Sequence, residues 1–514
     1  MTSSIARAAY AVLFVCAALG ATRPVGADAP PDPGAIDAKI LAAAGAAPDA
    51  YHETRETVYS NGSKTIEHEY RRGKDYRYVR DTGPLHSEYG LLKGDSWHMN
   101  RNGQVILDDG DETNGLPEGT AAVVSVVRAP VDGYLIARLD ANGRGVKEYV
   151  QAATWRVVRR ERITPDGTII TTFDDFHPDN GRTFAHHLHV DDRLSNLTGD
   201  VQVMGYEPGA VSASQVEMPN PRRALVTFPA GLASVQLPAR FTDGEVLVRL
   251  TIGNRGLDFL LDTGASGIVI DGGVAQELGL ARYRRQENAF NGGRYETADA
   301  IAPEVKVGSL VMKDVVMSIA PAGFETGIQA KNVGLLGFDF LAELGVTIDY
   351  EHERVTVVPV RAFQPPTDAR TIPIDVRVGS GQPVTAVAIN GSKGDNFILD
   401  TGMQGTFTVT DSFARHHPEA FKNQVTDSDN ELFDAIGGQV EAKRYRMSRV
   451  DVSSASFRNF IGYRLVGKHA FELGEGDGII GSEFLKLFTV SLDYAESRVY
   501  LVPNRLGRSG LVDK

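Results

Sequence analysis

Two short stretches of the chain share one pattern, in which a run of apolar residues leads directly into an aspartate, a threonine and a glycine. The first is Leu-Leu-Asp-Thr-Gly at residues 260–264, and the second is Ile-Leu-Asp-Thr-Gly at residues 398–402. Such apolar runs predict buried strands. A carboxylate at the end of a buried strand is unfavourable unless it has a partner. We therefore expect Asp262 and Asp400 to be partners of each other.

The surroundings of these two stretches also match. The Asp-Thr-Gly motifs are separated by 138 residues, and two later motifs recur at a separation of 144 residues. Residues 335–337 match residues 479–481, and residues 348–350 match residues 492–494. Three ordered matches with one small change of length predict an internal duplication. Two similar units can face each other across a pseudo-twofold axis.

The length and charge of the chain limit its class. With 514 residues it is too long for one core, and we expect roughly two to four domains. Its net charge of −13 argues against a nucleic-acid partner. The only cysteine, Cys16, lies in the N-terminal apolar stretch, so the rest of the chain forms no internal disulfide and is stabilised by packing.

Residues 1–29 resemble a secretory signal. Arg7 precedes an apolar run over residues 8–19, and small residues follow at 26–29. The run is shorter than the roughly 20 residues that cross a bilayer, and no later stretch approaches that length. A lipoprotein signal that uses Cys16 is the alternative, but Phe14 and Val15 are bulkier than such a signal usually has. We expect an exported protein, periplasmic or secreted, without an integral membrane span.

Residues 31–217 form the first predicted domain after the signal. A helix is expected over residues 36–46, and the apolar period then falls to two, as in strands. Strands are expected at residues 76–80, 105–107, 155–158, 168–172 and 187–190. Asn-Gly or Asp-Gly turn signals occur at residues 61–62, 102–103, 142–143, 166–167 and 180–181. The predicted fold is an antiparallel meander after one helix.

The cadence of these strands resembles the half-barrel of periplasmic lipoprotein-carrier proteins. That resemblance implies a concave apolar face for a lipid or a peptide, and a β-rich accessory domain is the alternative. His186, His187 and His189 suggest a metal site, but no second ligand pair accompanies them, and histidines on strands are more often surface or pairing residues. We expect no metal.

Two further predicted domains, residues 224–360 and 372–503, are bounded by linkers at residues 218–223 and 359–371. In the first of them, alternating apolar residues predict a hairpin that turns at residues 254–256 and leads into Asp262. A short helix is expected over residues 272–280.

Each of these two domains resembles one lobe of a retropepsin-like aspartic protease of the pepsin and retroviral type. In that family a lobe carries an apolar-apolar-Asp-Thr-Gly loop, a glycine-rich flap hairpin, and two apolar residues with a glycine before a short helix. The resemblance implies a mainly β fold, in which two tandem β-barrel lobes form a bilobal unit after the β-rich N-terminal domain. It also implies a polypeptide substrate and no cofactor. It assigns Asp262 and Asp400 as catalytic, Thr263, Gly264, Thr401 and Gly402 as loop supports, and Gly292, Gly293, Gly437 and Gly438 as flap candidates.

The chemistry of the site follows from two adjacent carboxyl groups. Two such groups cannot both ionise, so they share one proton and titrate as a coupled pair. The ionised member takes a proton from a water molecule, while the protonated member polarises the scissile carbonyl. The expected activity is an exported aspartic endopeptidase, in which the two lobes of one chain pair in preference to a homodimer.

The sequence departs from the family pattern after each glycine. Many members have serine or threonine there, whereas this chain has Ala265 and Met403. Met403 favours the alternative interpretation, a catalytically inactive binding or scaffold protein whose N-terminal domain holds a lipid or a peptide. Two intact Asp-Thr-Gly loops argue against that alternative, because paired buried acids have little structural use by themselves.

Overall fold

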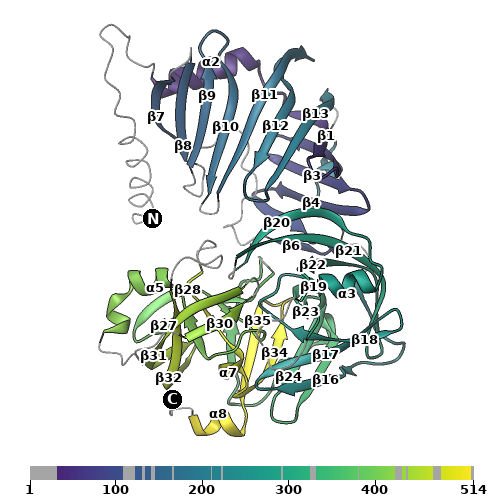
Figure 1. Cartoon of the computed structure of the whole chain (residues 1–514), viewed down its shortest axis with the longest axis vertical. Coiled ribbons are helices and arrows are strands. Elements are labelled where there is room, and N and C mark those ends of the chain that lie inside the picture. Colours follow the sequence, from purple (N-terminus) through teal and green to yellow (C-terminus); the bar gives the residue numbers. More distant parts are fainter. Residues whose placement is uncertain are drawn as a thin grey trace. The chain divides into compact units, whose positions relative to one another are not determined.

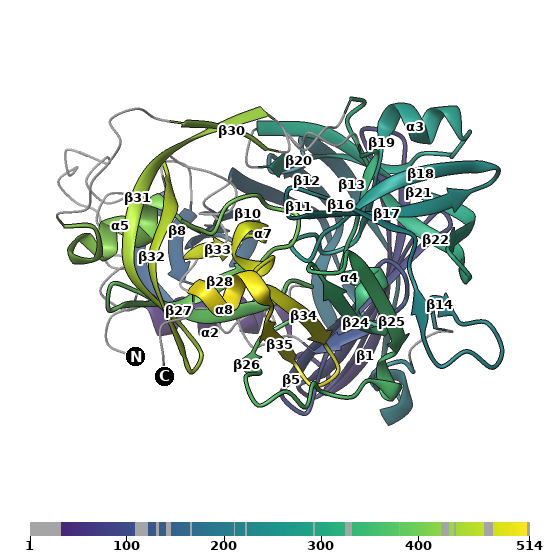
Figure 2. The ribbon, with the colours of Figure 1, turned by 90° about the horizontal axis from the view of Figure 1, so that it is seen from below.

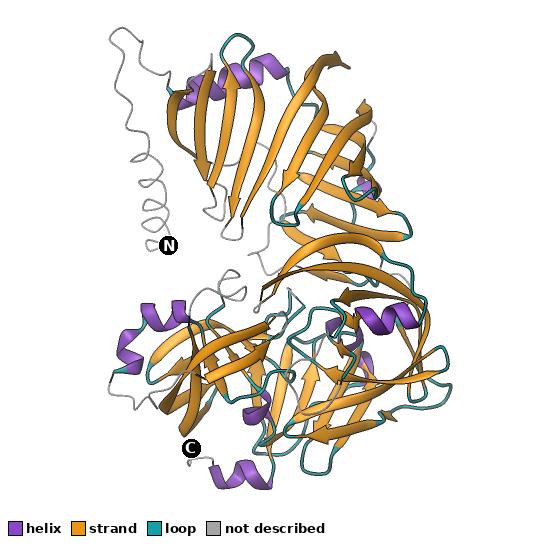
Figure 3. Cartoon of the chain, viewed as in Figure 1, coloured by secondary structure: helices purple, strands orange, loops and turns teal. Residues whose placement is uncertain are grey.

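The computed structural model describes residues 32–107, 122–129, 133–139, 145–164, 167–209, 211–220, 224–290, 293–323, 332–379, 381–422, 431–435, 438–466 and 476–510. The chain forms two compact units, of which the first is Met1–His98 with Gly110–Pro219 and the second is Met99–Asp109 with Asn220–Lys514. Strands dominate both units (Figure 3), so the protein is mainly β, as the sequence predicts. The signal-like residues 1–29 and part of the linker, residues 221–223, lie outside the described residues.

The 13-stranded sheet has the order β6-β5-β4-β3-β2-β1-β13-β12-β11-β10-β9-β8-β7 (Figure 1), and all its strands belong to the first unit except β6 and the last residue of β5, Met99, which belong to the second. Almost all neighbours are consecutive in sequence, which is the predicted meander. The strands are β1 (Ala50–Tyr59), β2 (Lys64–Arg72), β3 (Asp75–Thr82), β4 (Leu85–Leu92), β5 (Asp95–Met99), β6 (Val105–Leu107), β7 (Ala122–Ala129), β8 (Gly133–Leu139), β9 (Gly145–Gln151), β10 (Arg156–Thr164), β11 (Gly167–Asp179), β12 (Arg182–Asp192) and β13 (Leu197–Pro208). The helices are α2 (Pro33–Ala44) and the 3-10 turn η1 (Ala213–Gln215).

Backbone conformation at two turns explains where one prediction for this sheet is confirmed and where another differs by one residue. Asn180 and Gly181 have φ of +48° and +85° and form the two-residue turn between β11 and β12, as their sequence predicts. Trp155 was expected to begin a strand, but β10 begins one residue later at Arg156. Trp155 instead closes the preceding turn with φ of +56°, and its ring stacks on Tyr134 with centroids 5.4 Å apart.

One face of the sheet carries helix α2. Ile36 of this helix is fully buried against Ile136 of β8 and Val150 of β9. Directly paired residues share a face of an antiparallel sheet. Glu148 lies on the same face of β9 as Val150, two residues earlier. From Glu148 the paired residues on successive strands, β10 to β13 and then β1, are Arg160, Thr171, Val190, Gly199 and Tyr59. The α2 face therefore continues onto the alternate residues of β1.

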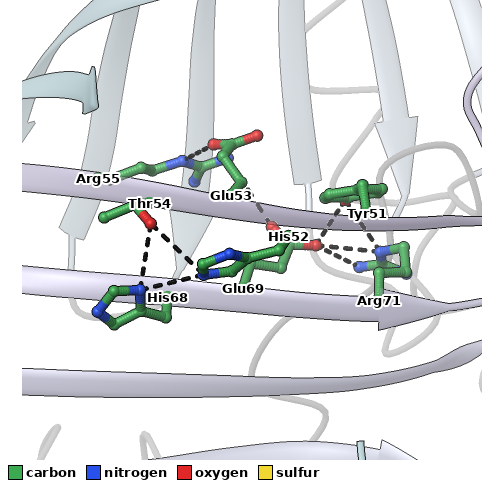
Figure 4. Close-up of polar contacts among 8 residues, drawn as sticks. All are labelled: Tyr51, His52, Glu53, Thr54, Arg55, His68, Glu69 and Arg71. Carbon is green, nitrogen blue, oxygen red and sulfur yellow. Dashed lines mark hydrogen bonds and ion pairs between the residues drawn. The ribbon is translucent and has the colours of Figure 1, made fainter. Parts of the chain in front are cut away.

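On β1 and β2 this face is polar (Figure 4). The hydroxyl of Tyr51 and the Nε of Arg71 both donate to Oε1 of Glu69, over 2.6 Å and 3.0 Å. Further along β1, Arg55 forms an ion pair with Glu53. The carboxylates of Glu53 and Glu69 are buried, so the arginines and the tyrosine replace their lost hydration. The face is thus apolar beneath α2 and lined by ion pairs along β1 and β2.

The second unit contains a nine-stranded sheet and a seven-stranded sheet. The nine-stranded sheet has the order β14-β22-β19-β23-β18-β17-β21-β20, with β16 paired to β17 and a further β21–β22 pairing. It consists of β14 (Val226–Thr227), β16 (Ala239–Thr242), β17 (Glu245–Ile252), β18 (Arg255–Leu261), β19 (Ile268–Asp271), β20 (Tyr283–Phe290), β21 (Gly293–Val307), β22 (Leu310–Ala320) and β23 (Gly334–Leu336). The seven-stranded sheet consists of β27 (Val384–Ile389), β28 (Ser392–Leu399), β29 (Phe407–Val409), β30 (Glu431–Ala435), β31 (Gly438–Val452), β32 (Ala455–Leu465) and β33 (Gly478–Ile480).

The two sheets share one pairing pattern. Every pairing among β17–β23 recurs among β27–β33, including the parallel pairs β18–β23 and β28–β33. In each sheet six strands close into a ring, because β17 and β22 both pair with β21, and β27 and β32 both pair with β31. The helices beside these barrels are α3 (Gly272–Glu277), α4 (Phe338–Leu341), α5 (Asp411–His416), η3 (Pro418–Phe421) and α7 (Ser482–Leu485).

A third, six-stranded sheet joins the two barrels in the order β15-β25-β24-β34-β35-β26 (Figure 2). Its strands are β15 (Val235–Gln236), β24 (Leu344–Asp349), β25 (Arg354–Pro359), β26 (Ile372–Asp375), β34 (Phe488–Asp493) and β35 (Arg498–Pro503), with η2 (Val360–Ala362) and α8 (Arg505–Gly510) beside it. Thr347 pairs with Ser491, and their hydroxyls are 3.2 Å apart. These residues are 144 positions apart, so this pair lies where the predicted pseudo-twofold axis would cross the sheet.

Candidate active site

The strand that precedes each aspartate is anchored to the strand behind it. The parallel pairs β18–β23 and β28–β33 end where the two Asp-Thr-Gly loops begin. The amide of Asp262 donates to the carbonyl of Leu336 over 3.1 Å, and the amide of Asp400 donates to Ile480 over 2.9 Å. Residues 335–337 and 479–481 therefore support the loops from behind, as the sequence predicts.

The two threonines join the loops to each other. The amide of Thr263 donates to Oγ1 of Thr401 over 3.1 Å, and the amide of Thr401 donates to Oγ1 of Thr263 over 3.0 Å. Each hydroxyl then donates to the carbonyl that precedes the opposite aspartate, Leu399 at 2.6 Å and Leu261 at 2.7 Å. All four bonds are buried, so the loops are held in one fixed arrangement.

The carboxyl groups of Asp262 and Asp400 lie together and are hydrogen-bonded to each other. Oδ1 of Asp262 accepts the amides of Gly264 at 2.8 Å and Ala265 at 3.1 Å. Oδ1 of Asp400 accepts the amide of Gly402 at 2.8 Å. Glycine is required at both 264 and 402, because a Cβ atom there would overlap with the carboxyl group of the opposite loop.

Burial and proximity raise the pKa of both acids. The pKa of Asp262 is raised well above its usual value, first by burial and then by the charge of Asp400. Burial also raises the pKa of Asp400, while the amides of Gly402 and Met403 act in the opposite direction. Asp262 is 8% exposed, and Asp400 is less completely buried. The pair therefore holds one proton over a range in which isolated aspartates are ionised.

Each loop also has a neighbour that the sequence interpretation missed. The side-chain amide of Gln382 donates to the carbonyl of Gly264. Glu245, at the start of β17, is fully buried beside Gln404, and burial raises its pKa to about 7. Within the described residues its carboxyl oxygens have no hydrogen-bond partner. Gln382 lies two residues before β27, and Glu245 is the first residue of β17. Neither differs in sequence from an ordinary polar residue at a strand end.

Tyr494 is a third neighbour of the acids. Its side chain is buried, and the charges of Asp262 and Asp400 add to the effect of burial in raising its pKa. Tyr350, its counterpart in the match of residues 348–350 with 492–494, is affected by burial alone. The sequence match revealed both tyrosines, but only the structure distinguishes the one that lies near the acids.

The predicted flaps correspond to two hairpins. Gly293 begins β21 opposite Phe290 of β20, and Gly438 begins β31 opposite Ala435 of β30. A two-residue connection therefore separates the strands in each hairpin. Gly292 and Gly437 belong to these connections and lie outside the described residues.

The histidines of the first unit contact carboxylates. Nδ1 of His187 lies 2.7 Å from Asp174, and Nδ1 of His189 lies 2.9 Å from Asp200. His186 contacts the carbonyl of Phe184. In the part of the chain that the structure describes, no three histidine, cysteine, aspartate or glutamate side chains are grouped as metal ligands would be. The described helices include none long and apolar enough to cross a membrane.

Comparison with known proteins supports an aspartic protease-like region. The sequence model of the family described as aspartyl protease matches residues 248–340, which include Asp262 and its support at residues 335–337. No curated protein matches the chain in sequence. Among solved structures, the chain is similar to a LolA superfamily protein from Nitrosomonas europaea, with 11% identity, a TM-score of 0.29, and coverage of 35% of this chain and 97% of that chain. A retropepsin-like aspartic protease from Rickettsia conorii gives 23% identity, a TM-score of 0.19, and coverage of 24% of this chain and 89% of that chain.

Proposed function

We propose that the protein is an exported aspartic endopeptidase whose two tandem lobes form one catalytic site from Asp262 and Asp400. The observation that carries the proposal is the hydrogen-bonded pair of carboxyl groups, held on two loops that Thr263 and Thr401 cross-link. The match of the aspartyl protease family to residues 248–340 supports it. Export is proposed from the signal-like pattern of residues 1–29.

In the proposed reaction, Asp400 is ionised and Asp262 carries the shared proton. Asp400 removes a proton from a water molecule, and the oxygen of that water attacks the carbonyl carbon of the peptide bond. Asp262 gives its proton to the carbonyl oxygen, which produces a neutral tetrahedral intermediate. When the intermediate collapses, the C–N bond breaks, Asp400 gives the proton it took from water to the leaving nitrogen, and Asp262 takes back a proton from one hydroxyl of the intermediate. A carboxylic acid and an amine are released, and both aspartates return to their starting states. No covalent bond to the enzyme and no cofactor are needed.

Met403 is compatible with this proposal. The amide of Met403 donates to Asp400, so the backbone supplies part of what a side-chain hydroxyl at this same position supplies in the retropepsin-like proteases. The inactive-scaffold alternative would leave two buried, coupled acids without a role, and such a pair destabilises a fold rather than supporting it. The matched barrels and the shared six-stranded sheet favour pairing of the two lobes within one chain.

The test is cleavage of an unbiased peptide mixture across pH by the full chain, compared with Asp262→Asn and Asp400→Asn. Each substitution keeps the shape of the side chain and removes the titrating group, so we expect each to lower kcat/KM by roughly 10²- to 10⁴-fold. Loss in Asp262→Asn alone would indicate that the first lobe works as a homodimer. Unchanged activity in both variants, or a folded wild-type chain that cuts nothing, would refute the proposal.

A further inference from the structure

Asp339 is a buried acid close to the first catalytic loop. It is the second residue of α4, directly after the support at residues 335–337, and it is 2% exposed. Its Oδ1 accepts the side-chain amide of Asn100 at 2.7 Å, and its Oδ2 accepts that of Asn102 at 2.6 Å. A carboxylate this deeply buried depends on such donors. Burial raises the pKa of Asp339 to about 6, and the Asn102 bond opposes that rise.

The donors come from residues 99–109, which belong to the second unit although the chain on both sides belongs to the first. Asn102 also forms a two-way bond with Val316, donating to its carbonyl at 3.1 Å and accepting its amide at 2.8 Å. Gln104 donates to the carbonyl of Asp339 at 2.9 Å and to Glu343 at 3.1 Å. Ile106 packs against the core of this unit. The segment is therefore integrated by backbone, side-chain and apolar contacts.

The remaining charges around the segment are also paired. Arg101 contacts Asp299 of β21 at 2.7 Å, and Arg284 contacts the other oxygen of the same carboxylate at 2.8 Å. Glu343 accepts the amides of Leu225 and Val226 at 2.7 Å and 2.9 Å. Asn102 is thus a neutral donor to Asp339, while the nearby cation Arg101, whose charge also opposes the rise of the pKa of Asp339, is paired with Asp299.

Asp339 reaches the catalytic loop through its last residues. It accepts the backbone amide of Ile268, the first residue after the loop. A Cβ atom on Gly267 would lie 3.3 Å from its Oδ2. Asn102, Asp339 and Ile268 therefore form one continuous chain of hydrogen bonds, which ends six residues after Asp262.

The second lobe lacks this arrangement. Its matching position, 144 residues after Asp339, is Glu483, whose side chain is 36% exposed and pairs with Lys486 of the following turn at 2.6 Å. This pair is local and open to solvent, and such pairs contribute little to stability. The two loops thus differ in what holds them from behind.

We propose that residues 100–104 are a working part of the first catalytic lobe, and that Asn102 is a positioning residue that orients the Asp262 loop through Asp339. The inference rests on the proposed function. It also makes the N-terminal part of the chain necessary for an ordered active site, because residues 220–514 alone would leave Asp339 buried without its amide donors.

The test uses the full chain with Asn102→Ala, and with Asn102→Ser as a milder variant should the first fold poorly. Backbone hydrogen exchange is measured for residues 263–268 and for residues 401–406, together with kcat and KM. We expect faster exchange in the first loop only. We also expect kcat to fall roughly 10- to 100-fold with little change in KM, because a small displacement of a catalytic group has effects of that size. Asn102→Ser should show a smaller change in the same direction.

Two controls sharpen the comparison. Lys486→Ala removes the partner of Glu483 and should leave exchange at residues 401–406 unchanged. Asn61→Ala alters a surface turn of the first unit and should change neither loop. Exchange that rises equally in both loops, or wild-type exchange and kcat in both Asn102 variants, would overturn the inference. If the wild-type chain has no peptidase activity, the proposed function fails, while the exchange comparison still decides whether Asn102 orders the loop.

Discussion

The loops that carry Asp262 and Asp400 are joined in the same way and supported in different ways. The four bonds of Thr263 and Thr401 are reciprocal, and their lengths agree within 0.1 Å for each matching pair. Behind the first loop, Asp339 is buried and receives amides from residues 100–102. Behind the second, the side chain of Glu483 is paired with Lys486. The symmetric part fixes the distance between the acids, and the asymmetric part makes their environments unequal.

Unequal environments matter because a shared proton needs a preferred site. Burial raises the pKa of both acids, and Asp262 is the more buried of the two. Asp400 is less buried and is opposed in that rise by the amides of Gly402 and Met403. In a symmetric pair the two roles would be interchangeable. The proposed reaction assigns Asp262 as the acid and Asp400 as the base.

The largest effect should come from breaking the symmetric part. Thr263→Val and Thr401→Val keep the side-chain shape and remove one hydroxyl each, which leaves a buried amide and a buried carbonyl without partners. We expect each to lower the free energy of unfolding by roughly 2–4 kcal/mol, and by similar amounts, because the bonds are reciprocal. Urea unfolding of the full chain measures this. A large effect from one substitution and none from the other would show that the two threonines do not stabilise the loops equally.

A smaller effect should come from Glu245, a second difference between the two loops. Glu245 lies beside the second loop, whereas the uncharged Gln382 lies beside the first. Its pKa of about 7 in the folded state exceeds the ordinary glutamate value, so the unfolded chain ionises first as pH rises. Glu245 therefore favours folding most at low pH, and its contribution falls as pH rises from about 4.5 to about 7. The neighbouring charge of Asp243 acts in the same direction.

The check is Glu245→Gln, which removes the titration. Relative to the wild type, this variant should gain about 3 kcal/mol of unfolding free energy between pH 4.5 and pH 8. Urea unfolding at the two pH values measures the difference. Gln382→Ala, at the matching place beside the first loop, provides the control, because it removes no titrating group. A difference that does not vary with pH would mean that Glu245 has the same pKa in the folded protein as in the unfolded chain.

The smallest effect should come from the position after each glycine. Ala265→Ser and Met403→Ser introduce a hydroxyl that can donate to the neighbouring carboxylate and so lower its pKa. We expect the acidic limb of the activity profile to move to lower pH by roughly half a unit to one unit in Met403→Ser. Ala265→Ser should move it less, because its hydroxyl would lie beside Asp262, the acid that carries the shared proton in the proposed reaction. Equal shifts would weaken the assignment of separate roles.

The sequence predicted the parts that depend on local pattern. The apolar run before Asp262 forms β18, and the hairpin that leads into it is present. Its turn, however, is at Gly253 and Asn254 rather than at residues 254–256, because Ile252 pairs with Arg255 and Gly253 takes φ of +61°. The two apolar-apolar-Gly motifs support the loops as expected.

The parts that were missed depend on contacts between distant residues. Asn102 and Gly103 have the composition of a hairpin turn, and Gly103 does adopt a positive φ. Nothing in that pattern predicts that Asn102 also binds a carboxylate more than two hundred positions later. Glu245 is similar, since a glutamate before an apolar run is usually exposed, and only the packing of the unit shows that this one is buried.

The pairing of Thr347 with Ser491 at the centre of the six-stranded sheet has an evolutionary consequence. If such a sheet joined two separate copies of one lobe, every mutation would appear on both sides of the axis at once. A single chain that carries both lobes is free of that constraint. The first lobe can then acquire the buried Asp339 and its contacts with residues 100–104, while the second lobe keeps a solvent-exposed ion pair at Glu483. The hydrogen bonds between Thr263 and Thr401 need not change.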